Sequence, residues 1–113
     1  LRFRAADLLG ILNGIDAAAW DPATDPALPA NFSAADLAGK AACKAALQQR
    51  LGLEVDPHIA VYGVVARLAH QKGLDLLGES LGHIVGRMHV QFALLGSGDE
   101  RTEAMFRQAA ARH

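Results

Sequence analysis

The feature that most constrains this chain is a continuous apolar run, IAVYGVVA, from Ile59 to Ala66. A strand with one face in water alternates apolar and polar side chains, whereas a strand covered on both faces is apolar throughout. A second apolar run, MHVQFALLG, extends from Met88 to Gly96, and LDLLGESLGHIVGR between the two runs has leucines at helical spacing. Two such strands joined by a helix predict a right-handed crossover and a parallel α/β sheet.

Two further helices are predicted on either side of these strands. The segment SAADLAGKAACKAALQQRLGL is rich in alanine and leucine, with Ser33 as its expected N-cap and Gly52 as its end. The segment SGDERTEAMFRQAAARH predicts a last helix, capped by Ser97 or Asp99. The predicted order over residues 33–113 is therefore helix, strand, helix, strand, helix.

The first 32 residues do not continue this pattern. LRFRAADLLG is expected to be the last turns of a helix that ends at Gly10. The following AAAWDPATDPALPANFS is rich in Pro, Asn and Asp, which predicts a loop or linker and a domain boundary nearby. Because two strands are too few for a stable domain and the chain begins with Leu1, we expect an internal piece of a longer protein.

Composition and charge exclude several classes of protein. The 11 basic and 12 acidic side chains are well mixed, which argues against a module that binds nucleic acid or a membrane surface. No apolar run approaches the roughly 20 residues of a membrane helix, and no signal peptide is apparent. The single Cys43 cannot form an internal disulfide, which favours a reducing cytoplasm, and we expect its side chain to be buried.

Two cations and a glycine follow the first strand. Ligands of open parallel sheets bind at the carboxyl ends of the strands, where RLAHQKG lies. Arg67 offers a planar fork of donors to phosphate oxygens, and Lys72 places a point charge near the start of the next helix. Gly73 lets a ligand or another backbone come close. These residues predict a diphosphate site; the alternative is that both cations are ordinary solvated side chains.

The other candidate sites match known binding motifs less completely. GSGD after the second strand resembles the start of a dinucleotide fingerprint, but Arg101 stands where a third glycine belongs, so both a capped turn and a nucleotide contact remain open. The chain has no D-x-D pair, P-loop or metal-ligand spacing of His with Cys43, and we expect neither a metal nor a cofactor. His70 either touches ligand or faces solvent, and Trp20 either packs on a domain or stacks on a sugar.

Three segments in this order, ILNGID with WDPATDP, then GKAACKAALQQRLGL, then GVVARLAHQKGLDLL with LLGSGD, resemble bacterial glycogen synthases and plant starch synthases. The resemblance covers essentially the whole chain. It implies a GT-B enzyme in which two Rossmann-like domains enclose the active site. Residues 1–32 would end the N-terminal domain and form the inter-domain linker, and residues 33–113 would begin the nucleotide-binding domain. It further implies transfer of glucose from ADP-glucose to the non-reducing end of an α-1,4-glucan, with retention of configuration and without a metal.

The same resemblance implies roles for single residues. Arg67 and Lys72 match family cations that contact the donor diphosphate, so they are the expected catalytic residues, stabilising charge on the departing ADP. Asn13 matches a residue near the donor, and Asp16 is expected to shape that loop. Gly73 is expected to allow close approach of the substrate.

The resemblance also covers two glycines of the GSGD segment, and the sequence differs from the family pattern at three positions. Gly96 and Gly98 match a turn near the nucleoside. Ala66 stands where the family usually has Ser, and we expect a modest effect. Gly78 and Gly82 replace good helix formers, which should lower stability by about 1 kcal/mol each. The lysine-and-glycine loop of the N-terminal domain and the later E-P-C-G-L segment are absent, so this piece alone is expected to be inactive.

Two other interpretations stay open. The same fold could use a UDP- or GDP-sugar as the donor. Alternatively, the chain could be a non-catalytic α/β nucleotide-binding or structural domain in which Arg67 and Lys72 are only solvated.

Overall fold

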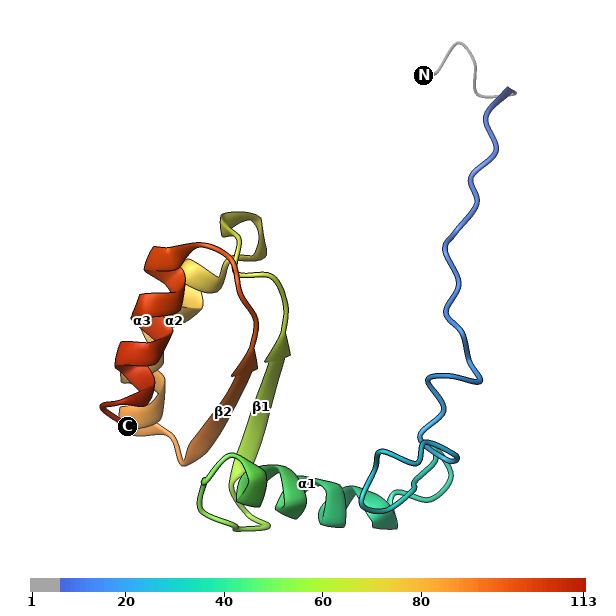
Figure 1. The fold of residues 1–113 in the computed structure, drawn as a ribbon, viewed down its shortest axis with the longest axis horizontal. Coiled ribbons are helices and arrows are strands. Elements are labelled where there is room, and N and C mark those ends of the chain that lie inside the picture. Colours follow the sequence, from blue (N-terminus) through green and yellow to red (C-terminus); the bar gives the residue numbers. More distant parts are fainter. Residues whose placement is uncertain (1–6) are drawn as a thin grey trace.

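The computed structural model describes residues 7–113. In this part of the chain the elements are α1 (Ala38–Arg50), β1 (Ala60–Val65), the 3-10 turn η2 (His70–Lys72), α2 (Leu74–Arg87), β2 (Val90–Leu95) and α3 (Glu100–Ala110) (Figure 1). The strands β1 and β2 pair in parallel, with Ala60 opposite Val90 and Val65 opposite Leu95. This confirms the predicted parallel α/β sheet and the predicted order of its elements.

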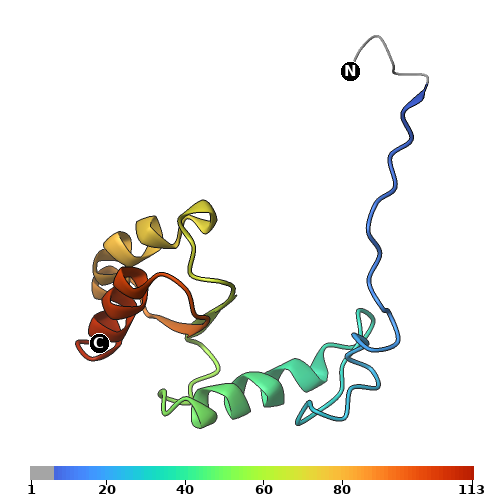
Figure 2. The same cartoon turned by 45° about the horizontal axis from the view of Figure 1, so that its top comes forward.

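The two helices α2 and α3 pack on each other over one side of the sheet, whereas α1 extends away from it (Figures 1 and 2). Among residues 7–113, the small core consists of four buried apolar residues, Ile59, Leu68, Leu74 and Leu81. The expectation that the first strand is covered on both faces is wrong within this chain, since Val65 is 82% exposed and Tyr62 is 51% exposed. The reason is that both packed helices lie on the same side of the sheet.

The helix α2 forms over its predicted residues in spite of its glycines. A Cβ atom at Gly78 would overlap the flexible end of the Met105 side chain of α3, which would have to move. A Cβ atom at Gly82 would meet only His113 Nε2, at an ordinary 3.8 Å. Neither glycine of α2 is therefore required by a clash with backbone atoms.

The start of α1 differs from the prediction. Ser33 does not cap the helix; its Oγ accepts from the backbone N–H groups of Ala35 and Asp36 at 3.3 and 3.2 Å. Asp36 Oδ1 then accepts from the N–H of Ala38, where the helix begins. Short polar side chains that bond to nearby backbone favour turns over helix, and here they delay the helix by five residues relative to Ser33.

The end of α1 is as predicted. Gly52 has φ of 68°, the left-handed conformation that glycine adopts at low cost. Its N–H donates to Gln49 O at 3.1 Å, and the N–H of Leu53 donates to Gln48 O at 2.9 Å. This pair of bonds is a Schellman motif, which satisfies the last carbonyls of the helix.

A buried amide joins α1 to the sheet. Gln48 is 1% exposed, and its Nε2 donates to Gln91 Oε1 at 2.8 Å and to Asp56 O at 3.2 Å. Gln91 Nε2 in turn donates to Glu54 O at 2.8 Å. Buried polar groups are stable only when they are hydrogen-bonded, so these amides fix the helix end, the following loop and β2 to one another.

Replacing Gln48 by alanine should lower the free energy of unfolding by about 2 kcal/mol, because it leaves buried partners without their hydrogen bonds. Gln49→Ala is the matched control: the neighbouring side chain is exposed, and its loss should cost less than about 0.5 kcal/mol. Urea denaturation of both variants measures the difference. Equal midpoints for the two variants would show that the buried amide contributes nothing.

The segment before α1 is irregular, as expected for its composition. Asp21 and Asp25 each accept from a backbone N–H two residues later, at 2.9 and 2.8 Å. Asn31 Nδ2 donates to the carbonyls of Pro22 and Asp25 at 3.1 and 2.9 Å. Cys43 Sγ, which is half-buried rather than fully buried, donates to a carbonyl of the same segment at 3.1 Å. The linker is therefore held in place by its own side chains and by α1.

The expected helix ending at Gly10 is not seen over Leu8–Gly10, where the structure has no regular secondary structure; residues 1–6 lie outside the described residues. Leu9 and Ile11 are 88% and 86% exposed. A short helix is marginal unless its apolar face packs on something, and these side chains have no such surface here.

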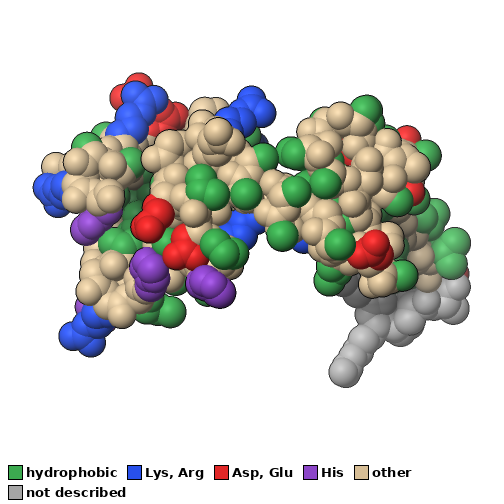
Figure 3. All heavy atoms as spheres, turned by 90° about the horizontal axis from the view of Figure 1, so that it is seen from below, with side chains coloured by type: hydrophobic (Ala, Val, Ile, Leu, Met, Phe, Trp, Pro, Cys, Tyr) green, Lys and Arg blue, Asp and Glu red, His purple; other side chains and the backbone are tan. Residues whose placement is uncertain are grey.

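The described residues contain no helix that is both long and apolar enough to cross a membrane. Figure 3 shows acidic and basic side chains scattered over one face of the molecule, without a basic patch.

Candidate functional site

The loops that follow β1 and β2 meet at one edge of the sheet, as predicted. We call residues 66–73 the first loop and residues 96–99 the second loop. The N–H of Ala66 donates to Leu95 O at 3.1 Å, and the N–H of Leu68 donates to Ser97 O at 2.9 Å. Leu68 O accepts in return from the N–H of Asp99 at 2.8 Å. The parallel pairing thus continues beyond the strands, and it fixes the two loops to each other.

The two loops approach so closely that the second loop must have glycine at positions 96 and 98. A Cβ atom at Gly96 would overlap the carbonyl oxygen of Ala66, and one at Gly98 would overlap the carbonyl oxygen of Leu68. Any side chain at either position would push the loops apart. The G-x-G pattern therefore has a structural reason within this chain, and the expected nucleoside contact of these glycines stays a prediction.

Both predicted cations are exposed at this edge. Arg67 lines a shallow pocket with residues from the ends of both strands, namely Val65, Ala66, Leu95, Gly96 and Ser97. Lys72 is the last residue of η2. Within residues 7–113, neither Arg67 nor Lys72 is paired with a carboxylate. Their positive charges are therefore available to an anionic ligand.

Gly73 connects η2 to α2 in the left-handed conformation, with φ of 66° and ψ of 21°. This conformation requires glycine, and the space beside its Cα is open. Within residues 7–113, no side chain caps the start of α2, so its first backbone N–H groups can donate to an anion, although Asp75 places one negative charge in the same turn.

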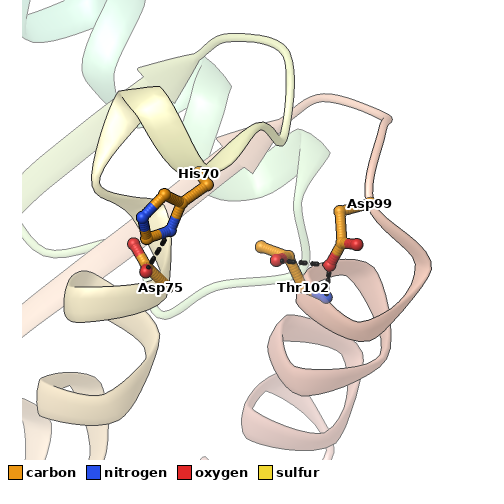
Figure 4. Close-up of polar contacts among 4 residues, drawn as sticks. All are labelled: His70, Asp75, Asp99 and Thr102. Carbon is orange, nitrogen blue, oxygen red and sulfur yellow. Dashed lines mark hydrogen bonds and ion pairs between the residues drawn. The ribbon is translucent and has the colours of Figure 1, made fainter.

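On the side of these loops toward the helices, two aspartates each bind a neighbouring residue (Figure 4). His70 Nδ1 lies 2.8 Å from Asp75 Oδ2, and the His70 side chain is 93% exposed. The other oxygen of Asp75, Oδ1, is buried without a hydrogen-bond partner. The His70 side chain is exposed and bonded to α2, and a contact between it and a ligand stays a prediction.

Asp99, rather than Ser97, caps α3. Its Oδ1 accepts from the backbone N–H of Thr102 at 2.8 Å and from the Thr102 hydroxyl at 2.9 Å (Figure 4). These bonds, first the backbone one and then the hydroxyl one, lower the pKa of Asp99 from its ordinary value of 3.8. A lowered pKa means that the stabilisation by this cap is present above the ordinary pKa and is lost only as the pH falls through the lowered one.

Asn13 is not brought to this edge in the described structure, since residues 7–20 run apart from the sheet (Figure 1). Its expected place near the donor therefore stays a prediction. Asp16 does shape its loop: Oδ1 accepts from the N–H groups of Ala18 and Ala19, both at 3.0 Å. Trp20 is 76% exposed and packs on no domain within this chain.

No group of three or more His, Cys, Asp or Glu side chains among residues 7–113 could hold a metal ion. At the edge where the two loops meet, a guanidinium, an ammonium and a helix start lie together, and these groups suit phosphate oxygens.

Comparisons with known proteins identify relatives of this chain. No protein-family model matches the chain. It is 59% identical over all 113 residues to a glycogen synthase of Anaeromyxobacter dehalogenans (strain 2CP-1 / ATCC BAA-258) and 51% identical over all 113 residues to one of Leptothrix cholodnii. It is 53% identical over 94% of its length to a glycogen synthase of Streptococcus equi subsp. equi. The chain spans about a quarter of the length of these relatives, and the resemblance seen in its motifs is confirmed.

Proposed function

We propose that this chain is part of a cytoplasmic α-1,4-glucan glucosyltransferase that uses ADP-glucose. The proposal is supported by its similarity to curated glycogen synthases, which extends along the whole chain and about a quarter of the length of each relative. In this proposal residues 1–32 end the N-terminal domain of a GT-B enzyme and cross to the next domain. Residues 33–113 begin the C-terminal, nucleotide-binding domain. The observation that carries the proposal is the pair of joined loops that places two unpaired cations at the carboxyl edge of a parallel sheet.

The proposed role of these cations follows from where charge develops. Glucosyl transfer breaks the bond between the sugar and the diphosphate, and negative charge grows on the departing ADP. Fixed positive groups aimed at that charge stabilise the transition state more than the ground state. Arg67 can donate two parallel hydrogen bonds to phosphate oxygens, while Lys72 adds a point charge. The uncapped N–H groups at the start of α2 can donate to the same phosphate oxygens.

The remaining site residues have supporting roles in this proposal. Gly73 leaves open space beside the diphosphate, and Gly96 and Gly98 keep the second loop against the first, near the nucleoside. Asn13 approaches the donor only when the two domains of the full enzyme face each other. The α-1,4-glucan binds in the rest of the protein, so we expect this chain alone to be inactive.

The identity of the sugar nucleotide is tested by donor competition. The full-length enzyme that contains this chain is given equal concentrations of ADP-glucose, UDP-glucose and GDP-glucose with a glucan primer, and release of each nucleoside diphosphate is followed. We expect ADP to dominate, with glucose added at the non-reducing end. A clear preference for UDP-glucose or GDP-glucose would instead support another GT-B glycosyltransferase. Absence of transfer from every donor would support a non-catalytic domain.

A further inference from the structure

The turn η2, which carries Lys72, is stabilised by few backbone hydrogen bonds of its own. η2 is three residues long, and its backbone bonds are Lys72 N–H to Ala69 O and Gly73 N–H to His70 O, both at 2.9 Å. It is followed directly by Gly73, the residue type with the widest choice of backbone conformations. The backbone alone therefore defines the angle between this turn and α2 poorly.

A side-chain contact joins the two elements on either side of Gly73, η2 and α2. His70, the first residue of η2, is bonded through Nδ1 to Oδ2 of Asp75 at 2.8 Å (Figure 4). Asp75 lies in the first turn of α2; its other oxygen, Oδ1, is buried without a hydrogen-bond partner, so His70 is the one partner of this carboxylate among the described residues. The contact ties the start of η2 to a rigid element, and Lys72 lies between the two bonded residues in sequence.

We infer that His70 is a positioning residue: through Asp75 it holds η2 in the orientation that directs Lys72 at the donor diphosphate. This inference rests on the proposed function. The His70 side chain is 93% exposed, and exposed ion pairs contribute little to global stability. Loss of the contact should therefore change the step that depends on Lys72 and leave unfolding nearly unaffected.

The test uses three replacements of His70 in the full-length enzyme. In His70→Asn the amide nitrogen takes the place of Nδ1 and can still donate to Asp75, whereas in His70→Gln the amide nitrogen takes the place of Nε2, and His70→Ala removes the donor. We expect His70→Ala and His70→Gln to lower kcat about fivefold, the size expected from losing one exposed contact, with KM for ADP-glucose changed less than about twofold. His70→Asn should stay near the original rate. All three variants should keep the original Tm; equal losses in His70→Asn and His70→Ala would overturn the inference.

A second measurement tests whether the change in kcat caused by replacing His70 depends on Lys72. In a Lys72→Ala background, His70→Ala should lower kcat no further, because the group that it positions is already gone. If the two losses multiply, His70 acts on something else and the inference fails. If Lys72→Ala is impaired but all His70 variants are normal, the inference alone fails. If the unmodified enzyme transfers no glucose from ADP-glucose, the proposed function fails, and the inference with it.

Discussion

Replacing Lys72 by alanine in the full-length enzyme should lower kcat about a hundredfold or more, with a smaller change in KM for ADP-glucose. The ammonium has no carboxylate partner among the described residues and lies beside an uncapped helix start. In the proposed mechanism, its loss removes a positive charge that stabilises the departing diphosphate. Because the charge on ADP grows only as the bond to glucose breaks, the loss should appear mainly in kcat. Initial rates with a glucan primer at saturating donor measure it.

Lys40→Ala is the matched control for this prediction. Lys40 lies on α1, away from the two loops, with its ammonium 4.5 Å from the centre of the Phe32 ring. Its removal deletes the same charge from the protein but should leave kcat within about twofold of the original, because long-range interactions between exposed charges are screened by salt. A near-original rate for Lys72→Ala, or an equal loss in both variants, would contradict the role given to Lys72.

The second large effect is expected at Gly96. Alanine there would place a Cβ atom onto the carbonyl oxygen of Ala66, which is backbone and cannot rotate away. We expect the free energy of unfolding to fall by about 3 kcal/mol, as for overpacking at a site that cannot relax. The two loops would also separate, so activity of the folded fraction should fall as well. Denaturation of the purified variant and its specific activity check both parts.

Gly82→Ala is the control for this substitution. It is the same chemical change inside α2, where the nearest atom to a new Cβ is His113 Nε2 at an ordinary distance of 3.8 Å. Replacing a helix-interior glycine by alanine should raise the free energy of unfolding by about 1 kcal/mol. The two variants therefore should move in opposite directions. If Gly96→Ala is as stable as Gly82→Ala, the loops do not contact as described.

Strong periodicity explains which elements were predictable. The apolar runs and the leucine spacing predicted β1, α2 and β2 to within two residues, because these patterns reflect burial against neighbours along the chain. Ser33 shows the limit of a cap signal: the same hydroxyl that can cap a helix can also close a turn, and nearby Asp36 favours the turn.

Some features of the candidate site could likewise be predicted from the sequence, and others could not. The position of Arg67 and Lys72 at the carboxyl edge of the sheet could be predicted from the order of strand and helix, whereas their contact with a diphosphate stays a prediction. The bond between Gln48 and Gln91 could not, because it joins residues 43 apart that meet only after the sheet has formed. The link from His70 to Asp75 depends on the left-handed turn at Gly73, which no spacing rule specifies. In the proposed two-domain enzyme, the place of Asn13 depends on how the two domains face each other.

In the proposed function, the first loop binds the diphosphate of a sugar nucleotide. A crystal structure of the full-length enzyme with bound ADP tests it most directly. We predict phosphate oxygens within about 3 Å of the Arg67 guanidinium and the Lys72 ammonium, above the start of α2. A diphosphate bound elsewhere, with both cations still in solvent, would contradict the claim.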